Sequence, residues 1–468
     1  MKVLLVNPPV DNMLVNVPED IVEFRDVGYP NLGLMYIASF AEKHSGHDIK
    51  ILDMQVEGID FDALERRLAE DRPDVVGVPA TSFTLIDALL TCKAAKKTDP
   101  SIRTVLGGRH GSLYPKETAG LDNVDFVVTN EGEYTFLELL EEIDGAGRFD
   151  KVAGIAYKSD NGVVCTGPRG WIRDIDALPF PARHLTPYKK YRYALMGNDV
   201  YTTMMTSRGC PCNCLFCDRS LGKAFRFRSP RNVVEEMEEC SRMGITEIFI
   251  KDDTFTVNKR RVLRICDELA ERKLGLQLCV RTRVDLVDDE IMRKLREAGC
   301  KRIQYGIESG SQKVLDILKK DISLDQTREA VRIAKKHDMD VLGEFMIGSP
   351  GEGEKEIYDT LAFAVELDLD YVLFNLTTPY PGTELYRMGM DEGLFDDFWA
   401  RFARDPMNEA KLKFWTAHFT EEELMAMIKK VYKRYYRRPG YVLKRVAKVK
   451  SFPELMQKIR FALKIFGM

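Results

Sequence analysis

The stretch Ser207-Arg-Gly-Cys-Pro-Cys-Asn-Cys-Leu-Phe-Cys217 decides how the rest of the chain is interpreted. It places Cys210, Cys214 and Cys217 at the spacing C-x3-C-x2-C. Three thiolates on one loop can hold three corners of a [4Fe–4S] cluster, because soft sulfur ligands suit iron–sulfur centres. The fourth iron would then have no protein ligand and would be open to a small molecule.

Cys212 extends the run to C-x-C-x-C-x2-C, so a tetrahedral zinc site is an alternative. Structural zinc usually uses two separated knuckles, and the sequence has no second C-x2-C pair and no other Cys/His cluster. The other cysteines occur singly, which favours neither a disulfide framework nor an auxiliary cluster. They are Cys92, Cys165, Cys240, Cys266, Cys279 and Cys300. We therefore expect the iron–sulfur cluster, with Cys212 as a bystander.

The composition predicts two or three domains in a reducing compartment. The chain has 468 residues, 45% of them hydrophobic, which is enough for more than one core. A net charge of −4 argues against a nucleic-acid partner. The sequence has no apolar run long enough to span a membrane, and Met1 leads into a strand pattern rather than a signal sequence. An oxygen-labile cluster and unpaired cysteines indicate a cytoplasmic protein.

Residues 1–145 alternate short apolar runs with helical patterns, which is typical of a Rossmann-like, doubly wound α/β domain. The expected strands are Val3–Val6, Ile49–Leu52, Asp74–Pro79, Ile102–Leu106 and Val124–Val128. Ligands of such sheets bind beyond the carboxyl ends of the strands. The residues expected in that crevice are Asn7, Pro8, Asp53, Pro79 to Ser82, Gly107, Gly108 and Glu131. Residues 146–195 are expected to form a linker with short strands and prolines.

Residues 196–385 alternate strand and helix six times, which predicts an incomplete (β/α)6 barrel with its chemistry at the carboxyl ends of the strands. The expected strands are Tyr201–Thr206, Glu247–Ile250, Leu276–Val280, Arg302–Ile307, Val341–Ile347 and Tyr371–Leu376. Polar groups or glycine follow most of them. These residues are the three cysteines, Asp252, Asp253, Arg281, Arg283, Glu308, Ser309 and Gly348.

Residues 386–468 are predicted to be helical, and from Lys429 onward they contain thirteen Lys or Arg and one acid, Glu454. One interpretation is a lid that packs on the barrel. Its apolar contacts would be Val431, Tyr435, Leu443 and Val446. The other is a peripheral contact with an anionic membrane, because basic residues lie beside Phe461, Ile465 and Phe466.

The cysteine spacing, with Phe216 before the last cysteine, resembles the radical S-adenosylmethionine (SAM) enzymes. The resemblance implies that the open iron chelates the methionine part of SAM and that reduction releases a 5′-deoxyadenosyl radical. It implies that Asp252 and Asp253 stand where the family receives the SAM ammonium, although Lys-Asp-Asp replaces the family's Gly-Gly-Glu. It implies that Arg281 or Arg283, with Glu308 and Ser309, meet the carboxylate and ribose, and that Gly343–Glu352, which includes Gly348, contacts adenine.

The N-terminal segment resembles the cobalamin-binding domain of one large radical SAM class. The matching features are Val-Asn-Pro-Pro after the first strand, Tyr29–Leu34, Leu106–His110 and Glu131-Gly-Glu133. No Asp-x-His-x-x-Gly run exists, so the resemblance implies cobalamin in its base-off form. His110 is interpreted as a surface residue. The alternative is a Rossmann-like domain that has lost its ligand.

Three functions follow from this resemblance. The first is cobalamin-dependent C-methylation of an unactivated carbon. The second is a radical cyclisation or rearrangement, as in the anaerobic magnesium-protoporphyrin ester cyclases, and the third is a non-enzymatic cobalamin or cluster carrier. The implied partners are a small-molecule, lipid or tetrapyrrole substrate and a flavodoxin or ferredoxin as electron donor. The basic tail adds the hypothesis of a peripheral contact at the inner membrane surface.

Overall fold

The computed structural model describes residues 1–15, 29–192 and 200–447, which form two compact units. The N-terminal unit consists of the described residues of 1–14, 29–191 and 397–411. The barrel unit consists of Val15 and the described residues of 192–396 and 412–447. A short C-terminal segment thus belongs with the first unit, although the barrel unit separates the two in the sequence.

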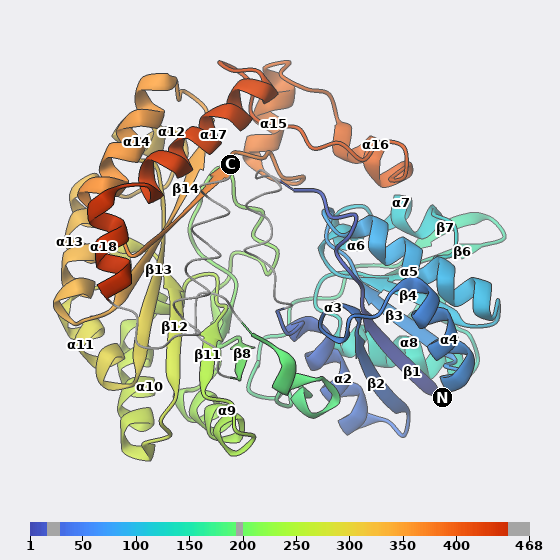
Figure 1. Ribbon diagram of the computed structural model, residues 1–468. Coiled ribbons are helices and arrows are strands. Elements are labelled where there is room, and N and C mark those ends of the chain that lie inside the picture. The colour runs from blue at the N-terminus through green and yellow to red at the C-terminus, as the bar shows by residue number, and fades with distance from the viewer. Residues whose placement is uncertain (16–28, 193–199, 448–468) are drawn as a thin grey trace. The chain divides into compact units, whose positions relative to one another are not determined.

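The N-terminal unit contains a seven-stranded sheet with the order β2-β1-β3-β4-β5-β6-β7 (Figure 1). Its strands are β1 Lys2–Asn7, β2 Asp48–Asp53, β3 Val75–Pro79, β4 Arg103–Gly107, β5 Phe126–Val128, β6 Ile155–Ser159 and β7 Gly162–Cys165. The first five are parallel, which confirms the doubly wound fold. β6 and β7 continue the sheet antiparallel, within the residues expected to form a linker. Asp160-Asn161 before Gly162 forms the tight turn that joins these two strands.

The helices of this unit are α2 Leu32–His44, α3 Met54–Glu57, α4 Phe61–Asp71, α5 Leu85–Thr98, α6 Arg109–Leu113, α7 Pro115–Gly120, α8 Glu133–Asp144 and α16 Phe398–Arg404. α16 comes from the C-terminal segment. Trp399 and Phe402, 1% and 2% exposed, pack their rings against Phe83 and His110. Two buried aromatic side chains therefore tie this helix to the ends of β3 and β4.

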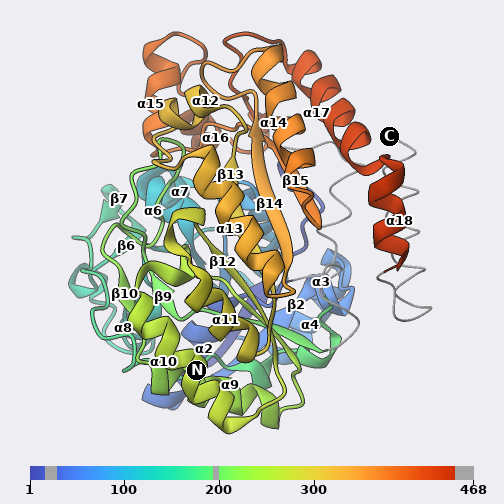
Figure 2. The ribbon, with the colours of Figure 1, turned by 90° about the vertical axis from the view of Figure 1, so that its left-hand side faces the viewer.

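The barrel unit contains six parallel strands in the order β8-β11-β12-β13-β14-β15 (Figure 1), of which β12 to β15 are labelled in Figure 2. They are β8 Tyr201–Met204, β11 Glu247–Ile250, β12 Gln277–Thr282, β13 Cys300–Glu308, β14 Asp340–Ile347 and β15 Tyr371–Leu376, with a small antiparallel pair of β9 Ser207–Arg208 and β10 Arg226–Phe227. Each of the six strands lies within two residues of its predicted bounds. The incomplete (β/α)6 barrel is therefore confirmed.

The helices of the barrel unit are α9 Pro230–Arg242, α10 Lys259–Arg272, α11 Asp289–Glu297, α12 Gln312–Ile317, α13 Leu324–Lys336, α14 Glu354–Glu366, α15 Glu384–Asp391, α17 Glu421–Tyr436 and α18 Pro439–Ala447. Their starts follow local rules. The Ser229 side chain accepts a hydrogen bond from the main chain of Asn232, and Pro230 is the first residue of α9.

α17 covers the free edge of the barrel sheet at β15. The hydroxyl of Tyr436 accepts from the N–H of Val372 (3.0 Å) and donates to its carbonyl (2.7 Å). Tyr432 does the same at Phe374, with both distances 2.9 Å. These hydroxyls satisfy an edge that would otherwise offer unpaired backbone groups to another strand.

The lid interpretation of the tail is confirmed for Val431 and Tyr435, which are fully buried. It is wrong for Leu443, which is 71% exposed because α18 turns this side chain to solvent. The side chain of Val446 and the apolar residues from Phe461 onward lie outside the described residues. Among the described helices, none is long and apolar enough to cross a membrane.

Candidate functional site

A buried carboxylate shapes the entry to the cysteine loop. Asp252, just after β11, is 1% exposed and accepts from the main-chain N–H groups of Thr206 (2.6 Å) and Ser207 (3.1 Å). The hydroxyls of the same two residues donate to its other oxygen, at 2.5 and 2.6 Å. Because a carboxylate offers about four acceptor positions, these four hydrogen bonds occupy all of them. Asp252 therefore holds the turn that leads from β8 to the cysteines.

Leu215 fastens the middle of the loop. Its N–H donates to the carbonyl of Leu318 and its carbonyl accepts from the N–H of Leu385, both at 2.9 Å. Its side chain is 3% exposed and packs with Leu385 and Trp415, and Phe216 is partly buried against the same cluster. The residue before Cys217 thus has a packing role that fixes the loop on the barrel.

Gly209, which precedes the first cysteine, lies where no side chain fits. Its φ is +85°, and a Cβ atom there would lie 2.4 Å from the carbonyl oxygen of Ala224. The next residue, Cys210, donates its N–H to the carbonyl of Gly222 (3.2 Å). A glycine is needed here because the chain passes so close to the segment before β10.

The thiols of the loop differ in depth. Cys214 is 7% exposed, while Cys210 and Cys217 are partly exposed, and the Sγ of Cys210 lies 3.7 Å from the hydroxyl of Thr254. A hydrogen bond from Cys212 lowers the pKa of Cys210 to about 5, whereas burial raises the pKa of Cys214, and that of Cys217 to about 11. Among the described residues, no three His, Cys, Asp or Glu side chains are gathered to hold a single metal ion. A cluster differs from such a site because each thiolate binds a different iron.

Asp253 and Arg281 place charge after β11 and at the end of β12. Asp253 is exposed, yet the surrounding protein removes part of its hydration. That desolvation raises the pKa of Asp253 to about 6, and the negative charges of Cys210 and Asp252 add to the effect. Arg281 forms an ion pair with Glu344 of β14 (2.9 Å). The two carboxylates of the Lys-Asp-Asp run thus have different surroundings, and Asp253 is the one open to solvent.

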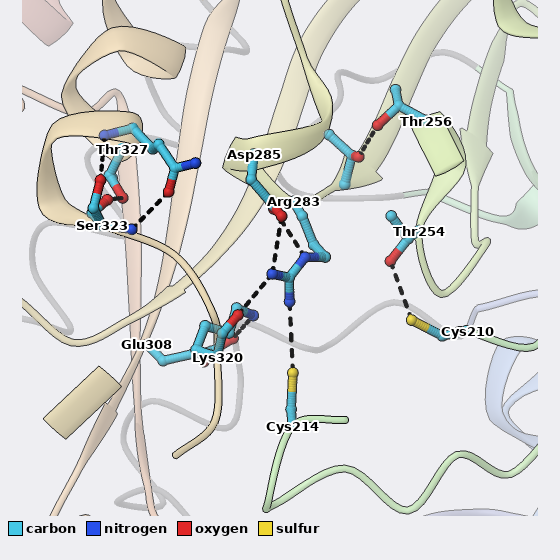
Figure 3. A network of polar contacts seen from close by, with 12 residues as sticks. Cys210, Cys214, Thr254, Thr256, Arg283, Asp285, Glu308, Lys320, Ser323 and Thr327 are labelled. Carbon is cyan, nitrogen blue, oxygen red and sulfur yellow. Dashed lines mark hydrogen bonds and ion pairs between the residues drawn. The ribbon is translucent and has the colours of Figure 1, made fainter. Parts of the chain in front are cut away.

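Arg283 connects the strand ends to the cysteine loop (Figure 3). Its Nε and Nη2 atoms donate to the two carboxylate oxygens of Asp285, at 2.9 and 3.1 Å, and Nη2 also donates to the carbonyl of Lys320 (2.6 Å). Its Nη1 atom lies 3.6 Å from the Sγ of Cys214. The Nζ atom of Lys320 in turn donates to Glu308 (2.7 Å). These contacts form one buried network behind the loop.

The ends of β13 and β14 carry the remaining predicted contacts. Ser309 is buried, and its hydroxyl shares a hydrogen bond with that of Thr360 (3.1 Å). Gly348 has φ +78°, and a Cβ atom there would lie 2.7 Å from a methyl carbon of Leu424. Its N–H donates to Glu352 (2.6 Å), whose burial raises the pKa of that carboxyl to about 8. Ser309 and Gly348 thus shape the strand ends through internal contacts.

In the N-terminal unit the strand order reverses between β1 and β3, which is where sheets of this kind bind ligands. Asn7 ends β1 and Pro8 follows it, and the carbonyl of Pro8 accepts from Gln55 (2.8 Å). Asp53 ends β2, is 1% exposed and accepts from the hydroxyl of Tyr191 (2.7 Å). Burial raises the pKa of Asp53, while the hydrogen bonds from Tyr191 and Asn7 partly offset that rise.

Ser82 and His110 form a buried polar pair after β3 and β4. The Ser82 hydroxyl lies 2.9 Å from Nδ1 of His110, and the imidazole is fully buried below Phe402. The prediction of a surface histidine was wrong because α16, from the other end of the chain, covers this position. Burial lowers the pKa of His110 to about 4. Its Nε2 atom has no hydrogen-bond partner among the described residues.

The glycines and Glu131 complete this end of the sheet. Gly108 has φ +99°, and a Cβ atom there would lie 2.6 Å from the carbonyl oxygen of Ala80, whereas Gly107 has open space at that position. Glu131 is buried and accepts from the N–H of Ile172 (2.7 Å). The structure therefore brings the crevice residues to the carboxyl ends of the strands, but Glu131 anchors a later segment.

Comparison with known proteins defines the class. Residues 204–364 match the Radical SAM superfamily, and residues 21–140 match the B12 binding domain. The first match spans the cysteine loop and most of the barrel. The chain is a radical SAM enzyme with an N-terminal cobalamin-binding domain, and its cofactors are SAM, a [4Fe–4S] cluster and cobalamin.

The relatives include both activities expected within this class. The chain is 34% identical to an uncharacterised methyltransferase of Pyrococcus horikoshii over 100% of this chain and 99% of that protein. It is 28% identical to the anaerobic magnesium-protoporphyrin IX monomethyl ester cyclase of Rubrivivax gelatinosus, over 89% of this chain and 81% of the cyclase. The fold matches OxsB, a cobalamin-dependent SAM radical enzyme solved with aqua-cobalamin and SAM, at a TM-score of 0.72 and 18% identity over 99% of this chain and 72% of OxsB.

The described residues fit these cofactors. The cysteine loop carries the three thiols of Cys210, Cys214 and Cys217 on a segment fixed by Asp252 and Leu215, which is what a cluster with one open iron needs. In the N-terminal unit, the Nε2 atom of His110 is a buried polar atom without a partner at the ligand-binding end of the sheet. Such an atom is expected to gain a hydrogen bond when a polar ligand is bound.

Sequence reasoning missed the roles of Lys320 and Thr254. Lys320 lies in Leu-Lys-Lys-Asp, a run that is typical of a helix end at the surface, yet its side chain is 7% exposed. Only the placement of Glu308 beside it explains that burial. Thr254 follows Asp253, and its hydroxyl contacts the Sγ of Cys210. Its position after a barrel strand was the one feature of the sequence that could have indicated a place near the cysteines.

Proposed function

We propose that the protein transfers a methyl group from SAM to an unactivated carbon of a small-molecule substrate, with cobalamin as the methyl carrier. Cys210, Cys214 and Cys217 hold the cluster in this proposal. When bound, the cluster supplies the electron that cleaves SAM, and cobalamin carries the methyl group to the substrate radical. A flavodoxin or ferredoxin supplies the electron.

The chain's own residues have distinct tasks around SAM. Asp253 receives the ammonium group, because its carboxylate is exposed beside the loop while that of Asp252 is fully engaged. Glu308 receives a ribose hydroxyl. One of its oxygens is held by Lys320, and the other has no hydrogen-bond partner among the described residues. Arg281, partly exposed beside Glu344, faces the carboxylate of SAM.

The observation that carries the choice of methyl transfer is the full-length similarity to the methyltransferase of Pyrococcus horikoshii. The identity to the magnesium-protoporphyrin ester cyclase is lower and covers less of both chains. A radical cyclisation is therefore the second candidate. A carrier function would give no reason for an exposed carboxylate and an arginine beside the cysteine loop.

The products of SAM distinguish the candidates. Full-length protein loaded anaerobically with cluster and cobalamin is reduced and given SAM with a deuterated methyl group, together with a small-molecule cell extract. Methyl transfer predicts 5′-deoxyadenosine and S-adenosylhomocysteine in equal amounts and a deuterated product. Cyclisation predicts 5′-deoxyadenosine without S-adenosylhomocysteine, and a carrier predicts neither.

Two variants test the cluster assignment. Cys214→Ala is expected to abolish SAM cleavage, because the cluster loses one of its three ligands. Cys212→Ala is the matched control, two positions away in the same loop, and is expected to retain cleavage. Cleavage retained in Cys214→Ala would contradict the assignment of the three ligands.

A further inference from the structure

The guanidinium of Arg283 is held in a single orientation by three contacts. Asp285 binds Nε and Nη2 as a fork, and the carbonyl of Lys320 accepts from Nη2. The side chain is 8% exposed, so little water surrounds it. With these donors used, Nη1 is directed at the Sγ of Cys214, 3.6 Å away (Figure 3).

An N–H group directed at a cluster thiolate changes the energy of the electron on the cluster. Hydrogen bonds to the sulfurs, net charge and solvent exposure set the reduction potential of iron–sulfur centres. A fixed positive charge stabilises the reduced form, which carries one more electron. Arginine keeps its charge at every relevant pH, and burial strengthens the interaction by lowering the local dielectric constant.

The other charged side chains of this buried network have partners of opposite charge. Lys320 is balanced by Glu308 at 2.7 Å, and Asp285 balances part of the charge of Arg283 through its fork. Within the described part of the chain, the N–H group of Nη1 is the donor through which this network contacts a cysteine sulfur. Its direction depends on Asp285, which lies two residues later in the same segment.

We propose that Arg283 raises the reduction potential of the cluster by donating an N–H group to the thiolate of Cys214, and that Asp285 positions it for this role. The inference rests on the proposed assignment of Cys214 as a cluster ligand. One electron from an external low-potential donor reduces the cluster, and Arg283 makes that transfer more favourable. Arg283 is thus assigned to the cluster itself, and the carboxylate of SAM is left to Arg281.

The test is a redox titration of the reconstituted full-length protein without SAM, followed by electron paramagnetic resonance of the reduced cluster. For Arg283→Gln we expect the ratio of reduced to oxidised cluster at a fixed potential to fall about tenfold, which corresponds to about 59 mV for one electron. Arg283→Lys keeps the charge but cannot bind Asp285 and Cys214 together, so a smaller fall is expected. Asp285→Asn keeps the arginine but loosens the fork, and should also give a smaller fall.

Arg296→Gln is the control for loss of one positive charge. Arg296 lies in the last turn of α11, which leads into the start of β13 at the opposite end of the sheet, and it pairs with Asp338. The reduction potential of the cluster in Arg296→Gln should equal that in the wild type. Iron and sulfide are measured first in every sample.

An unchanged potential in both Arg283 variants with full iron content would overturn the proposal, even if their KM for SAM rose. Loss of the cluster from both variants and from Asp285→Asn would also overturn it, because the network would then hold the loop rather than tune the cluster. A wild-type protein that binds no four-iron cluster would instead contradict the proposed function.

Discussion

Replacement of Asp252 tests whether hydrogen bonds from one buried carboxylate hold the cysteine loop. In Asp252→Ala, the N–H groups of Thr206 and Ser207 lose their acceptor and stay buried. Each unsatisfied buried donor costs about 1–3 kcal/mol, so the free energy of unfolding should fall by roughly 2–6 kcal/mol. That is a large part of the roughly 5–15 kcal/mol that stabilises a typical domain.

Asp252→Asn should be milder. Its remaining oxygen can accept from the two main-chain N–H groups, and its amide can donate to the hydroxyls of Thr206 and Ser207 after these rotate. The loss is then the charge assistance of the hydrogen bonds, for which we expect about 1–3 kcal/mol. Stability should therefore follow the order wild type, Asn, Ala.

The assay is urea unfolding of the metal-free protein, followed by circular dichroism, with iron and sulfide content after reconstitution as the second measurement. Asp253→Ala is the neighbouring control and should be no less stable than the wild type, because the raised pKa of Asp253 shows that its charge does not stabilise the fold, while its affinity for SAM should fall. Wild-type stability and iron content in Asp252→Ala would refute the reasoning. Equal defects in the Asn and Ala variants would show that the charge, and not the pattern of acceptors, is what the loop requires.

Two further predictions concern the edge of the barrel sheet and the buried histidine. Tyr432→Phe and Tyr436→Phe should each lower the free energy of unfolding by about 1–3 kcal/mol, because each leaves buried backbone groups of β15 unsatisfied. Thermal unfolding compares them with Tyr358→Phe, whose hydroxyl has no hydrogen bond among the described residues, and equal effects of the three changes would contradict the prediction. The stabilisation that neutral His110 provides should be complete above pH 6.5 and be lost as the pH falls toward 4, since the pKa of His110 is lowered to about 4. In urea unfolding over this pH range, the free energy of unfolding of His110→Gln should rise by up to about 3 kcal/mol relative to that of the wild type, and a constant difference would refute the burial argument.

The fold could be predicted from the sequence wherever a local pattern determined the structure. The six barrel strands are short apolar runs bounded by charged or glycine residues, and the start of α9 follows from Ser229 and Pro230. The hairpin of β6 and β7 was recognised as strands, but its pairing with β5 was not. A pairing partner is a long-range property, and nothing local to Ile155–Ser159 specifies it.

The sequence predicts which cysteines bind the cluster, but it does not predict the contacts that support the cysteine loop. The cysteine spacing identifies the loop, but the burial of Lys320 depends on Glu308, and that of His110 depends on Phe402 at the other end of the chain. Lysine and loop histidine are usually exposed, so the residue type alone predicts exposed side chains at both positions, whereas both are buried. Each is buried because a distant segment supplies a partner or a cover.

Asp252 and Asp253 show the limit most clearly, because identical neighbours have different tasks. Successive side chains of an extended segment point in opposite directions, so the sequence predicts that one of the pair faces inward and the other outward. It does not predict which one. The choice follows from Thr206 and Ser207, whose N–H and hydroxyl groups converge on Asp252 at the exit of β8 and leave Asp253 exposed beside the cysteines. The motif indicates that a carboxylate lies beside the site, and the donors of Thr206 and Ser207 determine that Asp252 is engaged while Asp253 stays open to solvent.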